Sequence, residues 1–198
     1  EADGPDDAAA QVDGRVARRE RNVNAVLDVV LDLFGEESLF PTIEQAATGS
    51  GLSLRSLYRY FADPGELLEA TIVRSRERGV ELARLRSIGE GPLDARIEDF
   101  VATRLRLYET LGPVYRATVA NAARLPRISN ELAKTRDDFR RQFSLQFAPE
   151  LRTHKPAQRD VMLNGGDVIT QLDSIDYLRR VSGLSVAKTV AVLTSTLH

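Results

Sequence analysis

Apolar residues recur along this chain at the three- and four-residue spacing of an amphipathic helix. The first clear stripe consists of Val26, Val29, Val30, Leu33 and Phe34, at positions that share one face of an α-helix. No stretch alternates between apolar and polar residues for long enough to predict a strand. The pattern therefore predicts an all-α protein.

Glycine and proline divide the helical pattern into segments. Ser53 and Ser185 are placed to cap helices, and Asp63-Pro64-x-Glu66 combines an N-cap, a proline at the first helical position and an acid in the first turn. After the first stripe, the predicted helices span about residues 41–48, 53–60, 64–88, 93–111, 113–123, 126–147, 156–177 and 185–197. Residues 1–14 lack a periodic apolar pattern, so we expect a disordered tail there.

The amino-acid composition limits the kinds of catalytic and metal sites that the chain can form. The 198 residues hold no cysteine and only two histidines, His154 and His198. This excludes a disulfide scaffold and a cysteine nucleophile, and it leaves almost nothing for a metal cluster or Ser-His-Asp catalysis. P-loop, G-x-S-x-G and HExxH motifs are also missing. We therefore expect no catalytic residue, no metal and no cofactor; an all-α enzyme with a carboxylate pair is the remaining alternative.

Charge and hydropathy bear on partners and location. The net charge is −2, so the chain as a whole is not a polycation that seeks nucleic acid. Arg15, Arg18, Arg19 and Arg21 nevertheless crowd into one short run. This run is either a solvated helix end or an arm that reaches DNA phosphate or the minor groove. No apolar run approaches the roughly 20 residues of a membrane span, and we find no signal peptide, so a cytoplasmic location is expected.

The most informative stretch is residues 42–68, TIEQAATGSGLSLRSLYRYFADPGELL. Two short helices around a glycine-containing turn form a helix-turn-helix arrangement. Ile43, Ala47, Leu52 and Leu57 have the spacing of a small shared core, and Gly51 suits the left-handed conformation of the turn. Such a second helix directs its first turn into the major groove.

The second helix of this motif carries groups that bind DNA. Arginine contacts guanine edges or phosphate, and the hydroxyls of serine and tyrosine donate to phosphate. Leu57 and Phe61 are expected to face the core, whereas Tyr58 and Tyr60 cannot both face inward with Phe61 on so short a helix. The candidate DNA-binding residues of this segment are Ser53, Arg55, Ser56, Tyr58, Arg59 and Tyr60.

The pattern L-S-x-x-S-L-Y-R-Y-F-x-D, preceded by T-I-x-x-x-A-x-x-x-G, resembles the DNA-binding domain of the TetR family of transcriptional regulators. The specific part of the resemblance covers about residues 16–70. It implies a three-helix DNA-binding domain followed by an all-α ligand-binding domain. It also implies dimerisation through the last two long helices, and repression that a small molecule relieves.

The resemblance assigns roles to several residues. Thr42 matches a family position that usually touches a phosphate, and Tyr58 and Tyr60 match positions that contact backbone and bases. Arg55, Ser56 and Arg59 occupy the variable positions that select the sequence. Pro64 stands where the family commonly has lysine, and Ser38-Leu39 replaces a usual Gly-aromatic pair.

The domains expected on this basis are a tail over residues 1–14, a helix-turn-helix domain over 15–63, and a helical ligand-binding and dimerisation domain over 64–198. In the last of these, aromatic and leucine side chains at helical spacing are either plain core or pocket lining. The candidate ligand-binding residues are Phe100, Tyr108, Leu111, Tyr115, Phe139 and Phe143.

Apolar positions in the last two predicted helices suggest a four-helix dimer interface, with an intramolecular core as the alternative; the resemblance favours the dimer. The candidates are Val168, Leu172, Ile175, Val186, Val190, Leu193 and Leu197. The resulting hypothesis is a homodimeric repressor that binds a near-palindromic operator in double-stranded DNA and leaves it when a small-molecule effector binds. A regulator of the same family whose pocket is filled by its own side chains is the closest alternative.

Overall fold

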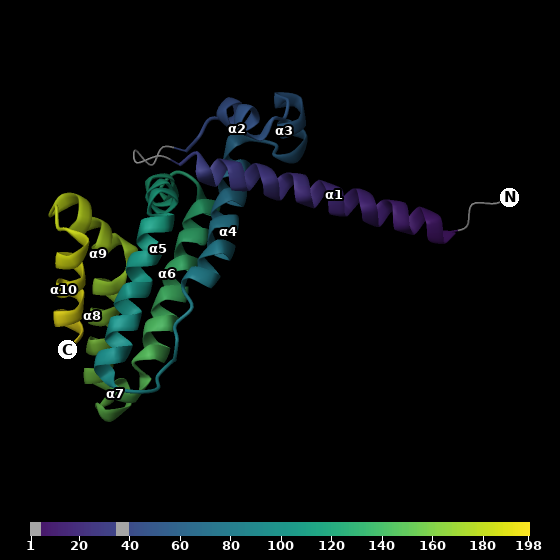
Figure 1. The fold of residues 1–198 in the computed structure, drawn as a ribbon. Coiled ribbons are helices and arrows are strands. Elements are labelled where there is room, and N and C mark those ends of the chain that lie inside the picture. Colours follow the sequence, from purple (N-terminus) through teal and green to yellow (C-terminus); the bar gives the residue numbers. More distant parts are fainter. Residues whose placement is uncertain (1–4, 35–39) are drawn as a thin grey trace. The chain divides into compact units, whose positions relative to one another are not determined.

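The computed structural model of the chain describes residues 5–34 and 40–198, which form ten α-helices, one π-helix and no strand (Figure 1). This confirms the all-α prediction. The chain divides into two compact units, one through Arg74 and one from Ser75 to His198. The division falls inside a helix, whereas the sequence analysis expected the domains to part at residue 64.

The first unit contains α1 (Pro5–Asp32), α2 (Ile43–Ser50), α3 (Leu54–Tyr60) and the start of α4 (Pro64–Leu82). Its core is the stripe predicted on α1, where Val26, Val30 and Phe34 are buried, together with Ile43, Ala47, Leu57 and Phe61. Leu33 stays 43% exposed at the edge of the stripe.

Helix α1 begins at Pro5, whereas the sequence analysis expected a disordered tail over residues 1–14; residues 1–4 lie outside the described part. The local signals explain the difference. Pro5 suits the first helical position, two acids follow it in the first turn, and residues 8–10 are alanines, the best helix formers. A helix needs an apolar stripe only where it packs against another element, so the lack of a stripe in these residues is compatible with a helix.

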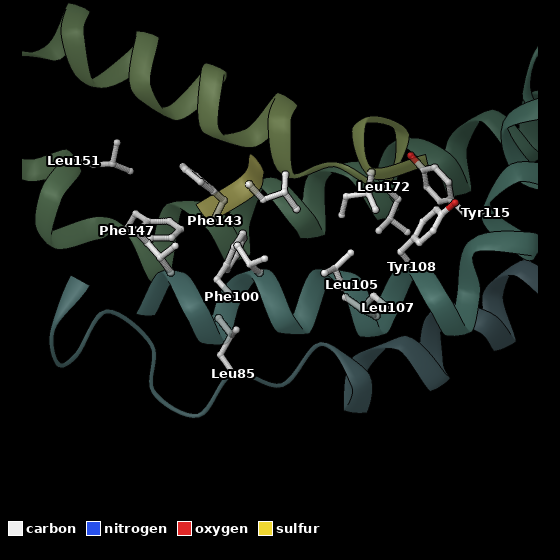
Figure 2. Close-up of a cluster of buried hydrophobic side chains, with 14 of the residues drawn as sticks. Leu85, Phe100, Leu105, Leu107, Tyr108, Tyr115, Phe143, Phe147, Leu151 and Leu172 are labelled. Carbon is white, nitrogen blue, oxygen red and sulfur yellow. The ribbon is translucent and has the colours of Figure 1, made fainter. Parts of the chain in front are cut away.

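The second unit contains the rest of α4 and the helices from α5 onward. They are α5 (Leu93–Ala122), α6 (Pro126–Gln146), α7 (Ala148–Thr153), α8 (Pro156–Thr170), α9 (Leu172–Asp176), a π-helix (Tyr177–Val181) and α10 (Val186–Leu197). Helix α5 packs against α6, α9 and α10, and α8 packs against α6 and α10. Side chains from these helices build one buried apolar cluster (Figure 2). Phe100, Phe143 and Phe147 meet at one end of it, with ring centroids 4.7–5.8 Å apart.

Two helix boundaries differ from those predicted. Helix α5 runs through Pro113 without a break, because residues on both sides of it, including Tyr108 and Tyr115, are buried in the same core and offset the cost of a proline, which is about 3 kcal/mol. Helix α4 ends at Leu82 rather than near residue 88. Side chains of neighbouring helices supply the hydrogen bonds that a further turn of α4 would have made. Arg106 donates to the carbonyl of Leu82 at 3.1 Å, and Gln142 donates to the carbonyl of Ala83.

The segment predicted as one helix over 156–177 is divided at Gln171, whose backbone is extended. Its side-chain amide donates to Asp167 Oδ1 at 2.6 Å, and Ser174 Oγ donates to the carbonyl of Val168 at 2.6 Å. These bonds satisfy polar groups at the break. The helices predicted from Pro126 and from Ser185 are confirmed.

Candidate nucleic-acid interface

The turn between α2 and α3 has the geometry that its residues predict. Thr42 caps α2: its hydroxyl accepts a hydrogen bond from the backbone N–H of Gln45 at 3.2 Å, and the Gln45 side chain accepts from the backbone N–H of Thr42 at 2.8 Å. Gly51 ends α2 in the left-handed conformation, with φ of 69°. The two caps fix the start of α2 and the direction of the chain into α3.

Helix α3 begins at the predicted cap. The Ser53 hydroxyl accepts from the backbone N–H of Ser56 at 3.2 Å, and the two serine hydroxyls are 3.0 Å apart. Leu57 is fully buried, and Phe61, directly after the helix, is 3% exposed. This confirms that Leu57 and Phe61 face the core, and it fixes which side of α3 faces outward.

The outward side of α3 presents Arg55, Tyr58 and Arg59. All three are exposed, Tyr58 to 51%, and their i, i+3, i+4 spacing places them on one face opposite Leu57. The helix contains no acidic residue. Two guanidinium groups and a phenol hydroxyl therefore form a donor-rich surface suited to an anionic, hydrogen-bonding partner.

Tyr60 differs from Tyr58 because its side chain is engaged. Asn22 of α1 donates from its amide to the Tyr60 hydroxyl at 3.4 Å. The guanidinium carbons of Arg59 and Arg19 lie 5.4 and 6.0 Å from the centroid of its ring. Hydrogen bonds from Asn22 and Arg59 lower the pKa of Tyr60. Tyr60 thus joins the end of α3 to α1.

The start of α4 follows the predicted capping signature. Asp63 Oδ1 accepts from the backbone N–H of Glu66 at 2.8 Å, and the Glu66 carboxylate accepts from the backbone N–H of Ala62 at 2.5 Å. Pro64 occupies the first helical position. Ser38 and Leu39, and the side chain of Arg15, lie outside the described residues.

The dimer candidates separate into two groups, and this corrects part of the prediction. Leu172, Ile175 and Leu193 are at most 2% exposed within the single chain. They belong to the intramolecular core and have no surface left for a partner. Val168, Val186 and Val190 are 36–64% exposed, and Leu197 is partly buried.

Further valines on the same helices are also exposed; the sequence pattern places Val161 on the same stripe as Val168, whereas it did not point to Val192. Val161 on α8 is 71% exposed and lies seven residues before Val168, and Val192 on α10 is 36% exposed. The spacing of 161 and 168 was the available signal, because positions seven apart share a helix face. We call Val161, Val168, Val186 and Val190 the exposed valine surface of α8 and α10. Val192 lies on another side of α10, because two residues along a helix turn by about 200°.

A pocket of about 750 Å³ lies in the second unit, among α5, α6, α7, α8 and α10. Most of its lining is apolar, and the histidines and Glu150 are among its polar groups. The lining residues are Leu93, Phe143, Phe147, Pro149, Glu150, Leu151, Thr153, His154, Met162, Gly165, Gly166, Ile169, Thr196, Leu197 and His198. Its volume is typical of a small-molecule site.

Of the six candidate ligand-binding residues, Phe143 lines this pocket and the other five do not. Phe100 is fully buried between other rings, and Phe139 stacks on the buried guanidinium of Arg104 at 4.6 Å. The hydroxyls of Tyr108 and Tyr115 donate to Asp176 at 3.0 Å and Asp173 at 2.6 Å. Leu111 packs, partly buried, against the core. Sequence spacing identified apolar faces but did not separate core from pocket lining.

Arg104 is a further buried group that sequence reasoning missed. Its guanidinium lies between the rings of Phe100 and Phe139, at 4.4 and 4.6 Å from their centroids, and donates to Gln142 and to the carbonyl of Phe139. Its Nε atom has no hydrogen-bond partner. Burial lowers the pKa of Arg104 to about 9.

Comparisons with known proteins bear on the fold. Neither a family model nor a curated protein matches this chain. A solved structure, a TetR-family transcriptional regulator from Streptomyces coelicolor, is similar with a TM-score of 0.71 and 21% identity, over 90% of this chain and 79% of that chain. This chain has the fold of a TetR-family regulator. The fold that the resemblance implied, a helix-turn-helix followed by a helical domain, is therefore confirmed.

The described residues of this TetR-like fold form neither a membrane span nor a metal cluster. None of the helices in residues 5–34 and 40–198 is both long and apolar enough to cross a bilayer. Within the same residues, no group of three or more His, Asp or Glu side chains is arranged to hold a metal ion.

Proposed function

We propose that this protein is a DNA-binding transcriptional regulator that contacts the major groove through α3. The observation that carries the proposal is the outward face of α3, where Arg55, Tyr58 and Arg59 are exposed together while Leu57 anchors the opposite side. Arginine forks match guanine edges and phosphates, and the phenol donates to phosphate oxygen. The TetR-like fold supports the same role, and it favours a regulator over the alternative of an all-α enzyme.

The hydroxyl residues of this interface, Thr42, Ser53 and Ser56, lie at the starts of α2 and α3. The hydroxyls of Thr42 and Ser53 accept backbone hydrogen bonds at the starts of α2 and α3, and the Ser53 and Ser56 hydroxyls are 3.0 Å apart. Thr42 therefore keeps its hydroxyl proton to donate to phosphate, and so does whichever of the two serines accepts the bond between them. Tyr60 contributes from the end of α3, where it is tied to α1. Tyr58 is the tyrosine that remains open to a base or a phosphate.

We further propose that the regulator acts as a homodimer through the exposed valine surface of α8 and α10. These helices pack against each other within one chain, so the same two helices of a second copy complete a four-helix arrangement. A twofold dimer presents two copies of α3, and its operator is a near-palindrome with half-sites about 34–36 Å apart or a multiple of that.

The pocket of the second unit is the proposed effector site. Phe143, Phe147, Met162 and Ile169 supply apolar lining, and the imidazoles supply hydrogen-bonding groups. A small molecule with an apolar body and a few polar groups suits such a site. Repression that ends when this molecule binds is the proposed mode of control. The volume of about 750 Å³ argues against the alternative in which side chains fill the pocket.

Selection of bound sequences from random double-stranded DNA tests the proposed function. The expected result is a palindromic consensus that the protein binds as a dimer, with affinity that falls steeply as salt rises. Recovery of no consensus, together with no measurable affinity for duplex DNA at low salt, would contradict the proposal. A consensus without twofold symmetry would contradict the dimer alone.

A further inference from the structure

The segment of α1 that precedes its packed stripe carries three exposed arginines close together. Arg18, Arg19 and Arg21 are exposed, and none of them forms an ion pair in the part of the chain that the structure describes. Glu20 lies among them and is also exposed, so it offsets one of the three charges. Asp28, nearer to the packed stripe, binds Arg74 at 2.8 Å. Three guanidinium groups on little more than one helical turn repel one another, and a single carboxylate neutralises only part of their charge, so a phosphate beside them lowers the remaining repulsion.

This basic segment is adjacent to the proposed DNA-binding helix in three dimensions. Arg19 lies over the ring of Tyr60, at the end of α3, and Asn22 donates to the hydroxyl of the same residue. Arg59 contacts that ring too, and it belongs to the outward face of α3. Tyr60 therefore brings the arginines of α1 to the edge of the surface formed by Arg55, Tyr58 and Arg59.

Helix geometry keeps the arrangement rigid. Helix α1 is continuous from Pro5 to Asp32, and its stripe at Val26 and Val30 is buried in the same unit as α3. Figure 1 shows α3 beside the middle of α1, with the N-terminal part of α1 continuing past it. The arginines are thus held on a packed helix and not on a free chain, which lowers the entropy lost when they bind.

We propose that Arg18, Arg19 and Arg21 bind the phosphate backbone of the duplex that α3 contacts, outside the bases covered by α3. The inference rests on the proposed function, and it adds a second DNA-binding element to it. Guanidinium groups bind phosphate oxygens in a bidentate manner. Three such groups on adjoining sides of one helix are placed to follow a sugar-phosphate strand. Phosphate contacts fix position and supply affinity but carry no sequence information.

The proposal makes a quantitative statement about salt. Each phosphate neutralised on duplex DNA contributes about 0.9 to the slope of log K against log salt concentration. Replacement of Arg18, Arg19 and Arg21 by alanine should lower that slope by up to about 2.7 for each DNA-bound subunit. The affinity for specific and for random duplexes should fall together, because phosphates are common to both.

The experiment compares two variants of the full chain that lose the same charge. The test variant is Arg18→Ala/Arg19→Ala/Arg21→Ala, and the control is Arg124→Ala/Arg141→Ala/Arg152→Ala, which removes three exposed arginines of the second unit. Binding of a selected consensus duplex and of a random-sequence duplex is titrated at several salt concentrations. Circular dichroism establishes that each variant is folded.

The expected result is a lower slope and a weaker affinity for both duplexes in the test variant, with the control unchanged. A third variant, Arg18→Lys/Arg19→Lys/Arg21→Lys, should restore most of the slope because it restores the charge. Equal slopes in the test and control variants would overturn the proposal while leaving the proposed function intact. Failure of the unsubstituted protein to bind either duplex would instead overturn the proposed function.

Discussion

The Cζ atom of Phe143 lies in the space that a side chain at Gly166 would need: a Cβ atom built on Gly166 is 2.0 Å from it. Two neighbouring rings prevent it from moving toward Phe100 or Phe147. Phe143 is 4% exposed, and its centroid is 4.7 Å from that of Phe147 and 5.8 Å from that of Phe100. Helix α8 therefore approaches α6 closely at Gly166 because this residue lacks a side chain.

Replacement of Gly166 by alanine should destabilise the second unit by about 1–3 kcal/mol or more, because the added methyl group overpacks the core against Phe143. Gly165 is the matched control, since a Cβ there meets no atom within 4 Å. Gly165→Ala should stabilise the protein by about 0.5–1 kcal/mol through helix propensity. Urea unfolding of both variants measures the two effects, and an equal change in both would contradict this account.

The two adjacent glycines also show what sequence could and could not predict. From the sequence, Gly165-Gly166 indicates either a bend or a close helix contact. Phe143 decides between these two possibilities, and it is more than twenty residues away in the sequence. A local sequence pattern therefore cannot distinguish a bend from a close helix contact here. Features that depend on neighbouring residues, such as the caps at Ser53, Asp63 and Ser185, were predicted correctly.

The errors in the predicted elements have the same origin. Proline favours a helix break, and at Pro113 tertiary packing on both sides overrides that preference. Leu172, Ile175 and Leu193 have the spacing of an apolar face, and spacing alone does not tell whether the face packs within the chain or between chains. For the proposed DNA-binding face, in contrast, the shortness of α3 left few possible orientations, and the prediction that Leu57 and Phe61 face inward is confirmed.

The side chain of Tyr58 should contribute more to DNA binding than the hydroxyl group of Tyr60. We expect Tyr58→Ala to weaken binding of the selected duplex by about 1–3 kcal/mol, because an exposed group that contacts phosphate or base is lost. Tyr60→Phe keeps the ring under Arg19 and Arg59 and removes only the bond from Asn22, so its effect should be smaller. Fluorescence anisotropy measures both, with light scattering to verify the oligomeric state. Unchanged affinity in Tyr58→Ala would argue against the assigned face of α3.

The exposed valine surface predicts that a charge placed on it separates the dimer. Val168→Asp and Val190→Asp should each raise the dimer dissociation constant by about 100-fold or more, because a buried, unpaired carboxylate costs about 3 kcal/mol or more. Val80→Asp is the control, since Val80 on α4 is 67% exposed and lies outside this surface. Light scattering over a concentration series measures the effect. Dimers of equal strength in all three variants would place the interface elsewhere.

The ion pair between Arg96 and Glu150 should make stability depend on pH in the acid range. Arg96 is buried, donates to Glu150 Oε2 at 2.9 Å and also donates to the carbonyl of Gln146 at 2.7 Å. The hydrogen bond from Arg96 lowers the pKa of Glu150 below its ordinary value of 4.5. The folded state therefore binds the proton less readily than the unfolded state, and the pair stabilises the fold above pH 4.5.

Glu150→Gln should lose about 1.5 kcal/mol of unfolding free energy at neutral pH, at the low end for a bond to a charged group because Glu150 is partly exposed. The difference from the unsubstituted protein should shrink as the pH falls below 4.5, through the lowered pKa of the folded state. Urea titrations at a series of pH values measure this difference. A difference that stays constant between neutral and strongly acidic pH would contradict the assigned ion pair.

The pocket of the second unit is lined by the residue types that are rarest in this chain's sequence. Both histidines and Met162, which is the sole methionine in the sequence, are among its lining residues. In an NMR spectrum, the proton resonances of the two imidazoles and of one ¹³C-labelled methionine methyl group therefore report on this pocket. No other histidine or methionine in the sequence gives a signal that overlaps with them. A library of compounds can be screened for occupancy of the cavity by these few peaks, without prior assignment of the backbone.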